Sequence, residues 1–119
     1  MKKIIIIFLI IFLVFQKSSA EVRAEQDTER KDDTVYLVKI EGEIDLGLAP
    51  FIKRIVLEAE KKSVQAIILE IDTFGGRLDA AVQIRDALLE SEMLTIAFIN
   101  ERAISAGALI SLSCKKICM

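Results

Sequence analysis

Two short segments of this 119-residue chain combine residue types that can stabilise a developing negative charge. The first, Asp72–Gly76, ends in two glycines that follow an apolar run. A glycine pair lets backbone amides turn toward a cleft, as an oxyanion hole requires. The same pair is also typical of an ordinary tight turn between a strand and a helix. Taken alone, this segment leaves both interpretations open.

The second segment is Ile104–Ala108, in which Ser105 precedes a run of small residues. A serine at the start of a helix is a candidate nucleophile, because free amides there stabilise an anion. Serine is equally common as a simple helix cap. One helix and one strand fit between Gly76 and Ser105, and in a parallel sheet this spacing brings both segments to one edge. A hydroxyl facing preorganised donors is the geometry of acyl transfer.

The composition excludes several other chemistries. The chain has no histidine, so it cannot by itself build a Ser-His pair, a Cys-His pair or a histidine-ligated metal site. A formal charge of −2, with one tyrosine and no tryptophan, argues against nucleic-acid binding. The acidic residues show no ligand spacing, and we expect no metal and no cofactor. If Lys115–Met119 is a strand, Cys114 and Cys118 lie too far apart for a disulfide, so we expect two buried free thiols.

The elements that would position these segments follow from the apolar pattern. Apolar and β-branched runs predict four strands, over 35–40, 65–71, 94–99 and 117–119. Helical spacing predicts three intervening helices, over 48–62, 78–89 and 105–114. Asp45 can cap the first helix, Pro50 fits only in its first turn, and the third helix is apolar nearly all round and should be buried.

The resulting order predicts an α/β fold of β-α-β units with a mainly parallel sheet. Residues 73–76 are expected to form the turn after the second strand. The sequence stops at the start of the fourth strand, so we expect a fold that is truncated before it is complete.

The N-terminus predicts export. Met1–Lys3 is positively charged and Ile4–Phe15 is an unbroken apolar run, shorter than the roughly 20 residues that span a bilayer. This pattern is typical of a secretory signal peptide over residues 1–20, with cleavage after Ala20. An uncleaved membrane anchor or a buried element is the alternative. Either the signal or the anchor would place the rest of the chain outside the cytoplasm, at or across the cytoplasmic membrane.

Residues 21–34 are rich in charge and poor in large apolar side chains, which predicts a polar linker. The predicted folded part is therefore 35–119.

Three short motifs in residues 35–119 resemble those of the NfeD-type membrane-associated serine proteases, which are also called stomatin-operon partner proteins. These proteins have the ClpP/crotonase fold. The three motifs occur in the family's order, and they are Ile40–Asp45, Ala66–Thr73 with Gly75 and Gly76, and Arg102–Ala103 with Ser105–Ala108. The resemblance implies that Ser105 is the nucleophile of a Ser-Lys dyad. It also implies that the backbone amides of Gly76 and Ala106 form the oxyanion hole, with Gly75 in the same loop.

The family's catalytic lysine lies some tens of residues beyond the serine and has no counterpart in this chain. Lys115 and Lys116 follow Ser105 by a whole helix of roughly 15 Å, and Lys39 is only a remote possibility. We therefore expect an N-terminal fragment of the protease domain that is inactive by itself.

The chain also departs from the family pattern beside the site. Phe74 stands where proline is usual before the two glycines, and it should loosen the turn that aims Gly76. Ile104 stands where a small alanine is usual, and it should narrow the cleft beside Ser105.

The leading hypothesis is an exported serine endopeptidase domain that cleaves apolar segments of membrane proteins. The resemblance implies a stomatin-like membrane protein as a possible partner, and the exposed edge of an incomplete sheet predicts homo-oligomers. The alternative is a non-catalytic NfeD-like binding or assembly module. A crotonase-type acyl-CoA enzyme is disfavoured by the export signal, because CoA is a cytoplasmic cofactor.

Overall fold

The computed structural model describes residues 1–7, 9–12 and 34–119. The chain divides into two compact units, residues 1–30 and 31–119. In the first unit, residues 2–7 and 9–12 are helical and their apolar side chains are exposed. Within the described ranges, no helix has both the length and the apolar character needed to cross a membrane. The predicted cleavage site after Ala20 and nearly all of the predicted linker lie outside these ranges.

The second unit alternates strands and helices in the predicted order. Its four strands are β1 (Val35–Ile44), β2 (Ala66–Gly76), β3 (Thr95–Ala103) and β4 (Lys116–Cys118). The helices between them are α2 (Leu48–Lys61), α3 (Leu78–Glu90) and α4 (Ala106–Leu112). All three strand pairings are parallel, and the spatial order β1-β2-β3-β4 follows the chain. The predicted α/β class and parallel sheet are confirmed.

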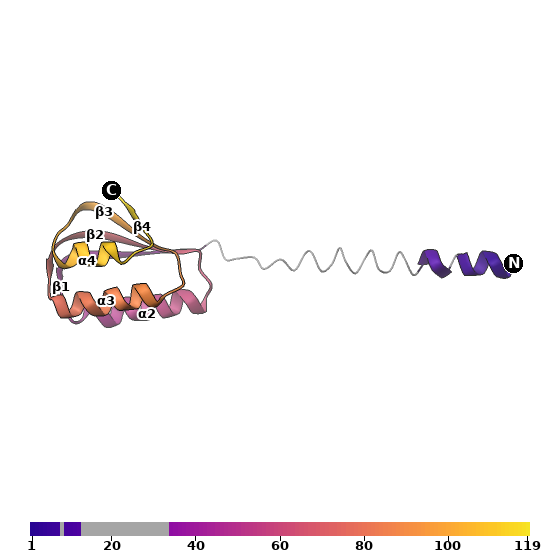
Figure 1. The fold of residues 1–119 in the computed structure, drawn as a ribbon, viewed down its shortest axis with the longest axis horizontal. Coiled ribbons are helices and arrows are strands. Elements are labelled where there is room, and N and C mark those ends of the chain that lie inside the picture. Colours follow the sequence, from indigo (N-terminus) through magenta and orange to yellow (C-terminus); the bar gives the residue numbers. More distant parts are fainter. Residues whose placement is uncertain (8, 13–33) are drawn as a thin grey trace. The chain divides into compact units, whose positions relative to one another are not determined.

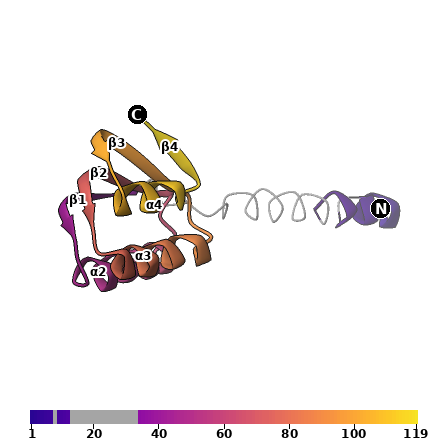
Figure 2. The same ribbon diagram turned by 60° about the vertical axis from the view of Figure 1, so that its left-hand side comes forward.

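The helices lie on one face of the sheet. Figures 1 and 2 show α2 and α3 side by side, with α4 lying closer to the strands. Inward-pointing residues of β2 alternate along the strand, and Ile67, Leu69 and Ile71 are fully buried in the same core as Ile84 and Leu88 of α3. Each such side chain contributes about 1.5–3 kcal/mol when it leaves water. This core fixes the direction of β2, and therefore where its carboxyl end points.

Asp45 caps the start of α2 through its side chain, as predicted, but it is not the N-cap residue. The Asp45 carboxylate accepts a hydrogen bond from the amide of Leu48 at 2.9 Å, although Gly47 occupies the N-cap position. Pro50 lies in the first turn, where its missing N–H costs nothing. On the buried faces of the helices, Ile52 and Ile84 lie in the core, whereas Leu78, the first residue of α3, is exposed.

The strands run further than predicted at their carboxyl ends. The β1–β2 register shifts between Glu41 and Glu43, and the β2–β3 register shifts after Ile71. Gly42, at φ 78°, provides the left-handed conformation for the first irregularity. Because the strands continue through these bulges, residues 73–76 belong to β2, and the predicted turn there is wrong.

Burial near the C-terminus is also lower than predicted. One side of α4 buries Ala106, Gly107, Ile110 and Ser111, but Leu112 is 74% exposed, because in the described part of the chain no layer covers that side. Cys114 and Cys118 are free thiols, as predicted. Cys118 is nevertheless exposed, because β4 is a short edge strand, so its predicted burial is wrong.

Candidate active site

The two segments singled out by the sequence meet at the carboxyl ends of β2 and β3. Gly75 and Gly76 end β2, whereas Ser105 and Ala106 form the junction between β3 and α4. A Cβ atom placed on Gly75 would lie 2.9 Å from the Cβ of Ser105 and 3.3 Å from the amide nitrogen of Ala106. The structure thus brings Gly75, Ser105 and Ala106 into direct contact at one edge of the sheet, as the strand-helix-strand spacing predicts.

Ser105 has an unusual backbone conformation for a residue other than glycine. Its φ of 54° and ψ of −116° lie outside the right-handed and left-handed helical regions, and such a conformation costs of the order of 1–3 kcal/mol. An ordinary N-cap serine has extended backbone angles and bonds a helix amide through its side chain. Ser105 is exposed and makes no such bond. A sharp strand-to-helix turn that exposes a serine hydroxyl is the arrangement found at nucleophilic serines.

Backbone hydrogen bonds hold this turn from both sides. The Ile104 amide donates to the Thr73 carbonyl at 3.1 Å, which ties the turn to β2. The Gly107 amide donates to the Ile104 carbonyl at 2.9 Å, which ties the turn to α4. The strained conformation of Ser105 is therefore fixed by its immediate neighbours.

The two glycines serve different purposes. The Gly75 amide donates to the hydroxyl oxygen of Thr73 at 2.9 Å, so it is already used within β2. Gly76 faces β1, where an added Cβ would lie 2.6 Å from the nitrogen of Ile44. Gly76 is thus needed for the close approach of β1, a reason that the sequence alone does not reveal. The Ala106 amide, at the first position of α4, has no acceptor within its own helix.

Thr73 is a structural residue of the site that the sequence reasoning did not single out. It is 1% exposed, its hydroxyl donates to the Gly42 carbonyl, and it accepts the Gly75 amide. Its methyl carbon lies where a Cβ on Gly107 would fall. One signal was available, because Thr73 is the only polar residue at an inward position of β2, after Ile67, Leu69 and Ile71.

Charged and apolar side chains surround the site. The Arg102 Nε atom lies 2.8 Å from a carboxylate oxygen of Asp72, and the guanidinium lies 4.6 Å from the centre of the Phe74 ring. The hydrogen bond to Glu101 raises the pKa of Arg102 further above its ordinary value. Phe74 therefore lies in β2, with the anchored guanidinium over its ring. The prediction that Phe74 loosens a turn is wrong. Phe74 is 72% exposed, and Ile104, the residue directly before Ser105, is 49% exposed.

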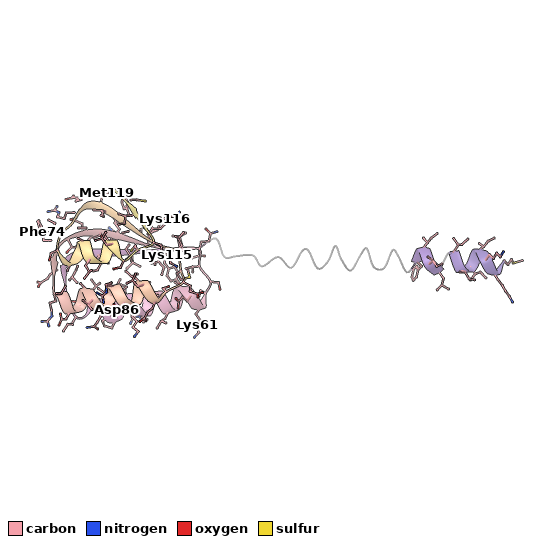
Figure 3. The ribbon with its side chains drawn as sticks, in the orientation of Figure 1. Lys61, Phe74, Asp86, Lys115, Lys116 and Met119 are labelled. Carbon is pink, nitrogen blue, oxygen red and sulfur yellow. The ribbon has the colours of Figure 1, made fainter. Side chains whose placement is uncertain are left out.

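Two of the three lysines considered as a general base bond other groups, and the third lies far from Phe74 (Figure 3). Lys115 donates to the Glu92 carbonyl at 2.5 Å, and Figure 3 shows Lys115 and Lys116 at the end of the sheet opposite Phe74. Lys39 bonds Glu41 at 3.3 Å, and this bond raises its pKa. A base lysine needs the opposite shift. Among residues 1–7, 9–12 and 34–119, no group of three or more acidic or cysteine side chains is placed to hold a metal.

Comparison with protein families gives one match that covers the whole folded unit. The family described as "NfeD1b, N-terminal domain" matches residues 34–119. Membrane protein NfeD1b of Bacillus subtilis (strain 168) is 36% identical over 106 residues, which is 89% of this chain and 24% of that protein. Membrane-bound protease PH1510 of Pyrococcus horikoshii is 34% identical over 88 residues, or 71% of this chain and 20% of that protein. The chain thus spans about a quarter or less of these relatives.

Solved structures give the same fold. The 1510-N membrane protease from Pyrococcus horikoshii, described as specific for a stomatin homolog, superposes with a TM-score of 0.64 at 34% identity. That match covers 70% of this chain and 43% of the protease chain. ClpP1 from Listeria monocytogenes superposes with a TM-score of 0.62 at 28% identity, over 66% of this chain and 46% of its own. The predicted ClpP-like fold is confirmed, and through residues 34–119 the chain belongs to the NfeD1b N-terminal domain family.

Proposed function

We propose that this chain provides the nucleophile-bearing part of a membrane-associated serine endopeptidase domain of the NfeD type. The observation that carries the proposal is the turn at Ser105, which has a positive φ and places an exposed serine in direct contact with Gly75. Support comes from a relative that is named a membrane-bound protease and from a mutant of 1510-N solved with a substrate peptide, with a TM-score of 0.65 at 32% identity.

In the proposed reaction, the Ser105 hydroxyl oxygen attacks the carbonyl carbon of a peptide bond. The amides of Gly76 and Ala106 donate hydrogen bonds to the oxyanion that forms. A neutral lysine accepts the hydroxyl proton and passes it to the leaving amine, and water then hydrolyses the acyl-enzyme ester. Lys39, Lys115 and Lys116 are not placed for this role. The base would come from outside residues 34–119, so we expect no peptide hydrolysis by these residues alone.

The proposed substrates are apolar segments of membrane proteins. Phe74 and Ile104 support this choice, because both are exposed apolar side chains on the two segments that form the site. A stomatin-like membrane protein is the proposed partner, by analogy with the specificity stated for 1510-N. We also propose that the domain is exported by the N-terminal segment and works at the outer side of the cytoplasmic membrane. Homo-oligomers would cover the unpaired edge of β1, which is an outer strand of the sheet in the described part of the chain.

A chimera tests the proposal without requiring the lysine in this chain. Residues 34–119 of this protein would replace their counterparts in the Pyrococcus horikoshii protease, which would supply the remainder of the domain. We expect a fluorophosphonate probe to label Ser105 of the chimera and an apolar peptide to be cleaved. Ser105→Ala should abolish both. Ser113→Ala, which removes a buried hydroxyl at the far end of α4, should abolish neither.

Two outcomes contradict the proposal. One is a chimera that melts cooperatively but is neither labelled nor able to cleave the peptide. The other is equal labelling of the chimera and its Ser105→Ala variant. The first outcome would favour the non-catalytic binding or assembly module, for which the exposed side chains of Phe74 and Ile104 offer an apolar contact surface.

A further inference from the structure

We infer that Thr73 is a positioning residue for the Ser105 site, because one buried side chain and its own backbone fix both the glycine segment and the serine turn. This inference rests on the proposed function of Ser105. Thr73 touches no reacting atom, yet it sets the distance between the nucleophile and the oxyanion donors.

The hydroxyl of Thr73 joins β1 to the glycine segment. It donates its proton to the carbonyl of Gly42 in the β1 bulge and accepts the amide of Gly75 at 2.9 Å. A single hydroxyl used in both directions has one favoured rotamer, which removes rotational freedom from the side chain. The backbone at Gly75, which leads into Gly76, is therefore held at a fixed distance from β1.

The backbone carbonyl and the methyl group of Thr73 fix the other half of the site. The carbonyl accepts the amide of Ile104 at 3.1 Å, directly before the strained residue Ser105. The methyl group occupies the space beside Gly107, the second residue of α4, so it sets how closely this helix approaches β2. Backbone strain of the kind seen at Ser105 persists only where surrounding contacts over-determine it, and Thr73 supplies two of these contacts.

An introduced thiol can report on this arrangement in the 119-residue chain without any catalytic lysine. In Ser105→Cys, amides preorganised for an oxyanion should also stabilise a thiolate, which lowers the thiol pKa below its usual 8.5 or so. The pKa is read from the rate of iodoacetamide alkylation against pH. Peptide-level mass spectrometry separates the introduced thiol from Cys114 and Cys118. We expect a thiol pKa at least one pH unit below the usual value.

Two further substitutions are then made in the Ser105→Cys protein. Thr73→Val keeps the shape but removes the hydroxyl, and it should return the thiol pKa most of the way to its usual value. Thr73→Ser keeps the hydroxyl and should keep the low pKa. The matched control is Thr95→Val, since Thr95 is also fully buried, accepts the Lys115 amide at 3.1 Å and lies at the opposite end of β3. It should lower the melting temperature without changing the thiol pKa.

The outcomes distinguish the proposed function of Ser105 from the positioning role of Thr73. An ordinary pKa in Ser105→Cys itself overturns the proposed function, and the inference with it. A low pKa that Thr73→Val leaves unchanged overturns the inference alone. Should Thr73→Val fail to fold, hydrogen exchange in the unsubstituted chain decides. The Gly75 amide must be protected as strongly as core amides, and free exchange of this amide contradicts a hydroxyl that holds it.

Discussion

Gly75 and Ser105 lie so close together that there is no room between them for a side chain on Gly75. A Cβ on Gly75 would lie 2.9 Å from the Cβ of Ser105 and 3.0 Å from the carbonyl oxygen of Ile104. Gly75 also has a φ of 113°, which side chains rarely permit. The absence of a side chain at position 75 is therefore a condition for the turn at Ser105, both for space and for backbone conformation.

Gly75→Ala should consequently destabilise the fold and displace the serine turn. Backbone strain and overpacking together should cost about 3 kcal/mol. The free energy of unfolding would be measured by urea denaturation. Gly42→Ala is the matched control, because Gly42 has a φ of 78° but nothing within 4 Å of an added Cβ. It should cost only the strain, about 1–2 kcal/mol. Equal losses for both variants would show that the contact with Ser105 carries no energy.

The fold was largely predictable from the sequence because its signals are local. Continuous apolar runs such as Ala66–Leu69 indicate strands buried in a parallel sheet, and the helical spacing between such runs indicates the crossovers. The strand ends were not predictable. The extension of β2 through residues 73–76 depends on a bulge beside β1, a contact between segments about 30 residues apart. Local pattern carries no information about such a partner.

The candidate site was predictable in position but not in its internal support. The glycine pair and Ser105 were named from residue type and Ala106 from the family resemblance, and the structure places Gly75, Ser105 and Ala106 together. The structural need for a glycine at position 76 was not predictable from the sequence, because it comes from the close approach of Ile44 in another strand. The hydrogen bonds of the Thr73 hydroxyl to Gly42 and Gly75 were not predictable either. In the sequence, a single threonine at this position indicates only the end of a strand.

The packing of Thr73 against α4 predicts a suppressor pair. Gly107→Ala places a methyl group where the Thr73 methyl already lies, and overpacking of this kind should cost about 1–3 kcal/mol. The threonine cannot rotate away without losing its bonds to Gly42 and Gly75. Thr73→Ser removes the obstructing methyl, so the double variant should regain at least half of the lost stability. This coupling would be read from urea midpoints of the four proteins.

The control for this pair is Gly47→Ala with Thr73→Ser, which should show no rescue because the atoms nearest an added Cβ at position 47 belong to Asp45 and not to Thr73. Additive losses in the Gly107→Ala and Thr73→Ser pair would contradict the placement of the methyl group.

Arg102 and Phe74 should be energetically coupled. The guanidinium lies 4.6 Å from the ring centre and is oriented by Asp72 at 2.8 Å. A double-mutant cycle with Phe74→Ala and Arg102→Ala should give a coupling of about 0.5–1 kcal/mol. The pair Phe51 and Arg54 on α2, in which the guanidinium lies further from the ring centre at 5.5 Å, provides a control cycle that should give a smaller coupling. A coupling near zero for Phe74 and Arg102 would mean that the ring is free of the guanidinium in solution.

Cys114 gives a prediction about pH. Burial raises the pKa of the Cys114 thiol to about 11, with a smaller opposing effect from its hydrogen bond with Thr95. In the unfolded chain this thiol has a pKa near 8.5. Between about pH 8.5 and pH 11, the unfolded state therefore loses its proton while the native state keeps it. The contribution of this thiol to stability is fully present below pH 8.5 and is lost as the pH rises through that window.

The urea midpoint should accordingly fall between pH 8 and pH 10, and the fall should be shallower in Cys114→Ala, which lacks the titrating group. Comparison of the two proteins isolates the effect of Cys114, because they share all other side chains. Alkylation gives a second measurement, since at pH 8 the half-buried thiol of Cys114 should react far more slowly than the exposed thiol of Cys118. The same pH dependence in both proteins, or equal alkylation rates, would show that Cys114 is not held in the core between α4 and β3.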